Sequence, residues 1–226
     1  MISPKWKYIN RNQGRLLVMV PGWAVDYRIF DSLDLKFNYL MPVEFSPFNF
    51  EKSLLNVIKD NNIKKISLFG FSLGGFLAAE FASKHKNLIE QLILIGIREK
   101  YKEEEISQVR KYLTANKNAY LYKFYAQCFS KKEHLSYFKK NLLKHYCQNM
   151  DLNFLLKTLD YLANTQMRPE QLNNIEKIKI IHGEGDNIAP MQEAANIGER
   201  LACAEFIGIK NAGHIPFLNE DFKKYI

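Results

Sequence analysis

The chain has 226 residues, of which 47% are hydrophobic and 25% are charged, as in an ordinary globular domain. This length suits one domain with a substantial core, and no apolar run approaches the length of a transmembrane helix. The first residues have no apolar core of the secretory-signal kind. Cys128, Cys147 and Cys203 show neither paired spacing nor a metal-site pattern, so we expect a reducing cytoplasm, no metal and no organic cofactor. We also expect no membrane span and no nucleic-acid partner.

The net charge is +8, and one segment holds all of it. Nine basic residues lie between Ile106 and Met150, where Glu133 is the single acidic residue, while the rest of the chain has 23 of each kind. A solvated helix face is the ordinary explanation of a lysine-rich segment. The alternative is a docking surface for an acidic partner.

The first sixty residues predict strands separated by turns and short helices. The predicted strands are Trp6–Ile9, Leu16–Val20 and Tyr39–Phe45, and the predicted helices are Tyr27–Leu33 and Phe50–Ile58. Leu16–Val20 is continuously apolar, which is typical of a parallel strand buried on both faces.

Next comes the stretch around which the chain is organised. The apolar run Ile66–Phe71 leads into Gly70-Phe71-Ser72-Leu73-Gly74, and small residues then continue as a helix to about His85. Strand, G-x-S-x-G and helix in this order predict a nucleophile elbow, with Ser72 on a strained turn at the helix N-terminus. Side chains at Gly70 and Gly74 would collide with neighbouring elements. The plainer interpretation is a glycine-rich turn with a chance serine.

Beyond the elbow, Leu92–Ile95 predicts another buried strand, and Glu103 to about Leu162 is helix-like throughout. Strand Ile178–Ile181, helix Met191–Leu201 and strand Ala204–Ile209 follow. The alternation predicts an α/β fold with a mainly parallel sheet covered on both faces. We expect a core of residues 1–97 and 171–226, and an inserted helical cap of residues 98–170.

Three strand ends carry a serine, an acid and a histidine: Ser72, Asp186 and His214. A serine hydroxyl needs an imidazole to take its proton, and the imidazole needs a carboxylate to orient it. Glu184 competes with Asp186, which lies further from its strand, and His182 is the one serious rival of His214. The other histidines (His85, His134 and His145) are interpreted as surface or packing residues.

The segments Gly70–Gly75, Gly183–Asp186 and Gly213–His214 together resemble the α/β-hydrolase superfamily, whose triad order is Ser, Asp, His. Within it, Gly22-Trp23, Ser72–Gly75 and Gly213–Phe217 resemble the pimeloyl-acyl-carrier-protein methyl ester carboxylesterases of biotin synthesis. The sequence departs from that family at Pro21, where a histidine is usual, and in the loop Phe45–Phe50.

The resemblance implies an oxyanion hole formed by the backbone N–H groups of Trp23 and Leu73. It also implies a basic cap that grips an acidic acyl-carrier protein. Within the cap, Lys123, Lys139, Lys140 and Lys144 are the candidate contacts, and Phe124 is a candidate lining residue of an acyl tunnel. The expected activity is hydrolysis of an acyl ester, most specifically the methyl ester of pimeloyl-acyl-carrier protein. The alternatives are another small-acyl carboxylesterase or thioesterase, a menaquinone-pathway type of lyase, and a binding protein that has lost catalysis.

Overall fold

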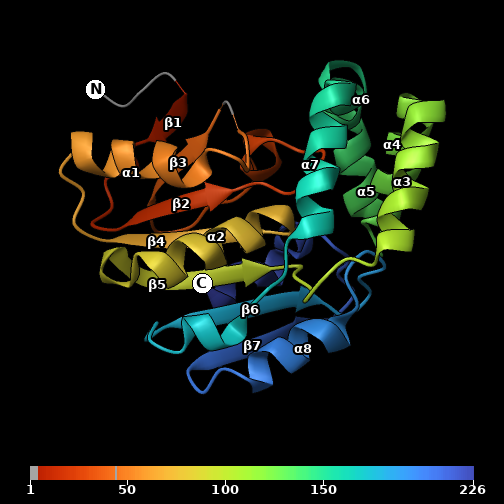
Figure 1. Ribbon diagram of the computed structural model, residues 1–226. Helices are drawn as coiled ribbons and strands as arrows, with labels where there is room; N and C mark the ends of the chain where they lie inside the picture. Colours follow the sequence, from red (N-terminus) through yellow and green to blue (C-terminus); the bar gives the residue numbers. More distant parts are fainter. Residues whose placement is uncertain (1–4, 44) are drawn as a thin grey trace.

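A seven-stranded sheet forms the centre of the computed structural model, which describes residues 5–43 and 45–226 (Figure 1). The strand order is β1-β3-β2-β4-β5-β6-β7. Strand β1 is antiparallel to β3, and every other neighbouring pair is parallel. The strands are β1 (Trp6–Ile9), β2 (Leu16–Val20), β3 (Asn38–Pro42), β4 (Ile66–Phe71), β5 (Ile89–Ile95), β6 (Ile178–Gly183) and β7 (Ala204–Ile209). The predicted mainly parallel sheet is therefore confirmed.

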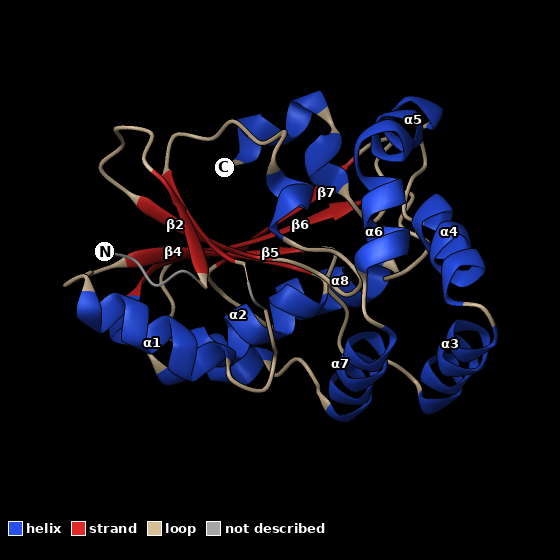
Figure 2. Ribbon diagram, turned by 90° about the horizontal axis from the view of Figure 1, so that it is seen from above, coloured by secondary structure: helices blue, strands red, loops and turns tan. Residues whose placement is uncertain are grey.

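Helices α1 (Phe50–Asp60) and α2 (Leu73–Lys84) cover one face of the sheet, and α8 (Met191–Glu199) packs on β6 and β7 (Figure 2). The short helical turns η5 (Pro216–Leu218) and η6 (Glu220–Tyr225) pack near the same two strands on the opposite face. The remaining short 3₁₀ turns are η1 (Tyr27–Phe30), η2 (Lys86–Leu88) and η4 (Pro169–Leu172). None of the described helices is both long enough and apolar enough to cross a membrane.

The sheet is built from uninterrupted apolar segments, because its central strands are covered on both sides. Residues Leu17 to Val20 are fully buried, as are most residues of β4. On the face opposite α2, Phe69 of β4 packs against Phe217 and Phe222, with ring centroids 6.0 Å apart in both pairs. These aromatic contacts hold the last segment of the chain against the core.

Between β5 and β6 the chain forms a separate helical layer beyond the carboxyl ends of the strands (Figure 1). Its helices are α3 (Glu103–Ala115), α4 (Lys117–Gln127), α5 (Lys132–Phe138), α6 (Lys144–Asn149) and α7 (Leu152–Asn164). Residues Lys139–Leu143 form one π-helical turn, η3, that joins α5 to α6 without a break. We call residues 98–170 the cap; its exact boundaries stay a prediction.

Three element boundaries differ from the sequence prediction by three residues each. Strand β3 ends at Pro42, not Phe45, because its partner β1 begins at Trp6, which pairs with Pro42; Glu44 lies outside the described residues. Strand β5 begins at Ile89, three residues earlier than predicted, because Ile89 still pairs with Ile66 across an irregular register. The helical turn η1 ends at Phe30, three residues early.

Candidate active site

Ser72 occupies the turn between β4 and α2 with φ 52° and ψ −115°, a backbone conformation that costs a non-glycine residue free energy. Its N–H donates to the carbonyl oxygen of Ile95, 2.8 Å away on β5, which holds the turn against the sheet. The glycines on either side have the steric role expected. A Cβ at Gly70 would lie 2.5 Å from the carbonyl oxygen of Gly74, and one at Gly74 would lie 2.2 Å from that of Val20.

The structure brings the three predicted catalytic side chains together. His214 Nε2 lies 3.0 Å from Ser72 Oγ, and His214 Nδ1 lies 2.8 Å from Asp186 Oδ2. The imidazole is 2% exposed and packs against the ring of Phe71 at a centroid distance of 5.1 Å. With its proton on Nδ1, the imidazole donates to the carboxylate and can accept the serine proton at Nε2.

The surroundings of Asp186 favour its ionised form, although its side chain is fully buried. Its Oδ1 accepts backbone N–H groups of Ile188 and Ala189 at 2.8 and 2.9 Å. Burial works against the charged form, but the charge of His214 and hydrogen bonds from His182 and His214 outweigh it and hold the pKa of Asp186 below its ordinary value. Its competitor Glu184 is exposed to solvent.

His182, the rival base, lies on the far side of the same carboxylate. It is completely buried, with Nε2 3.1 Å from Asp186 Oδ2 and 2.8 Å from the carbonyl oxygen of Ala189. His182 is therefore placed to act on Asp186 and not on Ser72. Elsewhere, His85 contacts Glu51 and His145 lies 3.7 Å from Asp26.

Of the two predicted oxyanion donors, Leu73 directly follows Ser72, and Trp23 follows Gly22, where an added Cβ would lie 3.2 Å from the Ser72 Cβ. Leu73 is the first residue of α2, so its N–H has no carbonyl partner within the helix. Within the described part of the chain, the N–H groups of Trp23 and Leu73 donate to no other backbone carbonyl. Both groups are thus free to donate hydrogen bonds to a negatively charged oxygen, and the helix N-terminus adds a positive dipole end.

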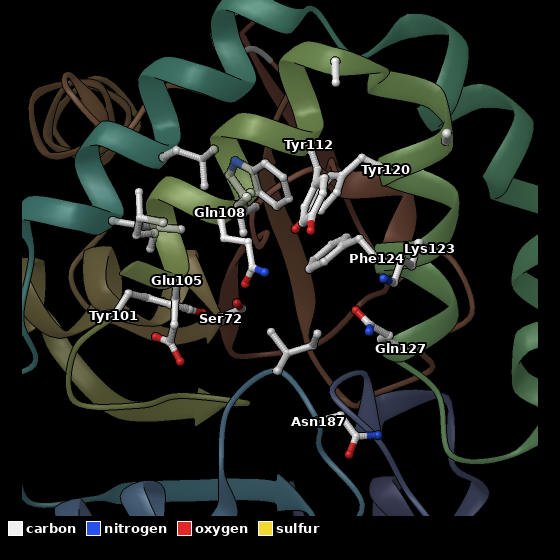
Figure 3. Close-up of a pocket in the computed structure, with 18 of the residues that line it drawn as sticks. Ser72, Tyr101, Glu105, Gln108, Tyr112, Tyr120, Lys123, Phe124, Gln127 and Asn187 are labelled. Carbon is white, nitrogen blue, oxygen red and sulfur yellow. The ribbon is translucent and has the colours of Figure 1, made fainter. Parts of the chain in front are cut away.

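A cavity of about 530 Å³ opens beside Ser72 and runs between α3 and α4 of the cap (Figure 3). Most of its lining is apolar or aromatic, and it includes Tyr112 of α3 and Tyr120 of α4 (Figure 3). The lining residues of the cap helices include Ile106, Gln108, Val109, Tyr112, Ala115, Ala119, Tyr120, Lys123, Phe124, Gln127, Leu159 and Leu162. Among the described residues, no cluster of three His, Cys, Asp or Glu side chains is arranged to hold a metal ion.

The structure separates the predicted substrate-binding residues into two groups. Trp23, Lys123 and Phe124 line the cavity, and the Trp23 and Phe124 rings meet edge to face at 5.1 Å. Lys139, Lys140 and Lys144 are exposed outside that lining, along the end of α5, η3 and α6. The ammonium group of Lys139 lies 5.0 Å from the ring centre of Tyr122, on the side of α4 away from the cavity. The role of these four lysines as carrier-protein contacts stays a prediction.

Sequence reasoning missed three residues at the mouth of the cavity: Arg98, Tyr101 and Glu105. Arg98 is 5% exposed, contacts Glu193 Oε1 at 3.0 Å and Glu105 Oε2 at 3.2 Å, and lies 4.7 Å from the Tyr101 ring centre. The Tyr101 hydroxyl lies beside Ser72, and burial raises the pKa of Tyr101 to about 12 (Figure 3). Arg98 comes just after β5, at the same sheet edge as Ser72. This position in the sequence could have indicated that Arg98 belongs to the site.

Comparison with known proteins places this geometry in a family. A family model described as serine aminopeptidase S33 matches residues 49–221, which is more than half of the chain. The pimeloyl-[acyl-carrier protein] methyl ester esterase of Nitrosomonas europaea is 23% identical, over 90% of this chain and 90% of that protein.

Solved structures agree on the fold. An esterase from Exiguobacterium antarcticum superposes with a TM-score of 0.81 at 20% identity, covering 97% of this chain and 91% of that one. A bromoperoxidase from Bacillus anthracis gives 0.79 at 15% identity, covering 97% and 92%. The predicted α/β-hydrolase fold is confirmed, and the chain belongs to the serine aminopeptidase S33 family of α/β hydrolases.

Proposed function

We propose that this protein is a serine carboxylesterase. The observation that carries the proposal is the hydrogen-bonded series from Asp186 through His214 to Ser72, which ends in the wall of a largely apolar cavity. Ester hydrolysis needs a nucleophile, a base and a place for an acyl chain, and these three are adjacent here.

In the proposed reaction, His214 Nε2 takes the proton of Ser72 as Oγ attacks the acyl carbon. The oxyanion is held by the N–H groups of Trp23 and Leu73, and the loss of one such contact typically costs about 3 kcal/mol of transition-state stabilisation. The imidazolium then protonates the leaving alcohol, and a water molecule activated by His214 releases the acid. Asp186 keeps the imidazole oriented and stabilises its charge throughout.

The finer proposal is the methyl ester of pimeloyl-acyl-carrier protein as substrate. It is supported by the 23% identical relative and by the cationic segment. Of the nine basic residues between Ile106 and Met150, only Arg110 forms a salt bridge with a described residue, its partner being Asp160. Unpaired lysines of this kind suit an acidic protein partner.

The alternative lyase would be expected to offer free arginines to a carboxylated substrate. Arg98, which lines the cavity, is already neutralised by Glu193 and Glu105, and Arg110 of α3 by Asp160. The arrangement therefore favours an uncharged ester group at Ser72.

Labelling by a fluorophosphonate probe tests the nucleophile. The parent should be labelled, Ser72→Ala should not, and Ser83→Ala, an exposed change on α2, should react like the parent. The rates at which the variants hydrolyse para-nitrophenyl esters of increasing chain length should follow the same order as the labelling. Hydrolysis by folded Ser72→Ala at the parent rate would show that the proposed nucleophile is wrong.

A further inference from the structure

Asp186 is contacted by two histidines, of which the proposed mechanism uses one. His182, near the end of β6, is completely buried and places Nε2 3.1 Å from Asp186 Oδ2. The same nitrogen lies 2.8 Å from the carbonyl oxygen of Ala189, at the far end of the turn that carries Asp186.

The surroundings of the His182 ring define where its proton lies. Nδ1 is buried and has no hydrogen-bond partner among the residues that the structure describes. An N–H there would be an unsatisfied buried donor, which is costly, whereas both neighbours of Nε2 are acceptors. His182 is therefore the neutral tautomer with its proton on Nε2, shared between Asp186 and Ala189.

We infer that His182 is a positioning residue that fixes the Asp186 carboxylate for its contact with His214, an inference that rests on the proposed esterase function. Two backbone N–H groups hold Oδ1, and His182 and His214 both hold Oδ2. The carboxylate can then neither rotate away nor turn toward the Ala189 carbonyl.

Among the residues that the structure describes, no other titratable group near this carboxylate takes over that role. Cys128 and Tyr101 interact with Asp186, but burial raises the pKa of both groups, so they stay neutral. The Cys128 thiol bonds to the carbonyl oxygen of Phe124 at 3.3 Å, and Tyr101 lies on the serine side. The donor on Oδ2 besides His214 is thus His182.

A matched pair of substitutions separates the hydrogen bond from packing. Glutamine carries an N–H near the place of Nε2, while methionine has a similar shape and no donor. We expect His182→Met to lower kcat for para-nitrophenyl butyrate about tenfold to a hundredfold with KM nearly unchanged. His182→Gln should recover kcat to within about threefold of the parent, and His134→Gln, in α5, should match the parent.

The low-field proton signal of the His214–Asp186 hydrogen bond gives a readout that packing alone would not move. It should keep its position in His182→Gln and shift in His182→Met, and Asp186→Asn should abolish it. If His182→Met does not fold, His182→Asn, whose amide is too short to reach Asp186, takes its place.

The inference is overturned if the folded donor-free variant keeps the parent kcat and proton signal, or if the Gln and Met variants lose activity equally. Either result leaves the esterase proposal intact as long as Ser72→Ala is inactive. Full activity of Ser72→Ala would instead contradict the proposed esterase function.

Discussion

The indole N–H of Trp23 donates a hydrogen bond to the backbone carbonyl oxygen of Leu155, 3.1 Å away. Trp23 follows β2 in the core, and Leu155 lies in α7 of the cap, so the bond joins the two parts of the molecule. The same tryptophan carries one of the N–H groups proposed for the oxyanion hole. The position of that N–H is therefore coupled to the packing of the cap.

The first prediction concerns the carboxylate. Asp186→Asn should lower kcat by roughly 10⁴-fold, because an amide cannot hold the required tautomer of His214 as a carboxylate does. Steady-state hydrolysis of para-nitrophenyl butyrate measures this. Glu184→Gln is the control, since Glu184 is exposed two residues away, and it should change kcat less than about threefold. Equal losses in the two variants would contradict the assignment of Asp186.

A second prediction addresses the acyl chain. Ala119 of α4 lines the cavity, so Ala119→Leu should fill part of it with three added carbon atoms. Hydrolysis of para-nitrophenyl octanoate should fall about tenfold or more, while the acetate ester should be little affected. Ala126→Leu, on the same helix but outside the cavity lining, should leave both rates unchanged. A uniform loss across chain lengths would mean that the acyl group binds elsewhere.

The third prediction tests the carrier-protein docking face. Replacing Lys139, Lys140 and Lys144 with Glu should raise KM for a carrier-protein ester and spare para-nitrophenyl butyrate, because the three lysines lie outside the cavity. Exposed ion pairs are individually worth under about 1 kcal/mol, so single changes should be mild. Added salt should weaken the carrier-protein reaction alone.

Its matched control has the same change of charge on the core: Lys52, Lys59 and Lys64, all exposed, replaced with Glu. This variant should keep the parent KM for both substrates. If the two triple variants have equal effects, the cap lysines form a solvated face and have no docking role.

A fourth prediction concerns stability. Arg98→Met should lower the free energy of unfolding by about 2 kcal/mol, because it removes the charged hydrogen bonds of a buried guanidinium, while the two carboxylates left behind are partly exposed. Urea denaturation measures this. Arg200→Met breaks contacts with Glu99 and Glu170 that are exposed, and it should cost less than about 1 kcal/mol. If Arg98→Met lowers the free energy of unfolding as little as Arg200→Met does, the ion pairs of Arg98 contribute little to stability.

The sheet and the order of the candidate triad could be predicted because each depends on a local signal. A strand with a continuous apolar run, such as Leu16–Val20, must be buried on both faces, which places it between two layers of helix. Ser72, Asp186 and His214 each follow the carboxyl end of a strand, and parallel strands end at one edge of the sheet.

The cap and the contacts around the triad could not be predicted in the same way. The location of Arg98 against Glu193 depends on how α8 packs on β6 and β7, across 95 positions of sequence. The separation of Lys123 from Lys139 depends on which face of α4 turns toward the cavity. The second bond of Asp186, from His182, depends on a tight turn that brings Ala189 back to the strand.

The π-helical turn Lys139–Leu143 affects how the sequences of homologues align with this one. A π-helical turn closes its hydrogen bonds one residue later than an α-helical turn, so the run from Lys132 to Asn149 contains one residue more than an unbroken α-helix of the same rotation. Past this point, Tyr146 is buried and its hydroxyl reaches Asp26, while Lys144 faces solvent. A homologue without the extra residue would need a one-residue gap here before its buried aromatic aligns, and a gap-free alignment would pair Tyr146 with a neighbouring, half-buried position.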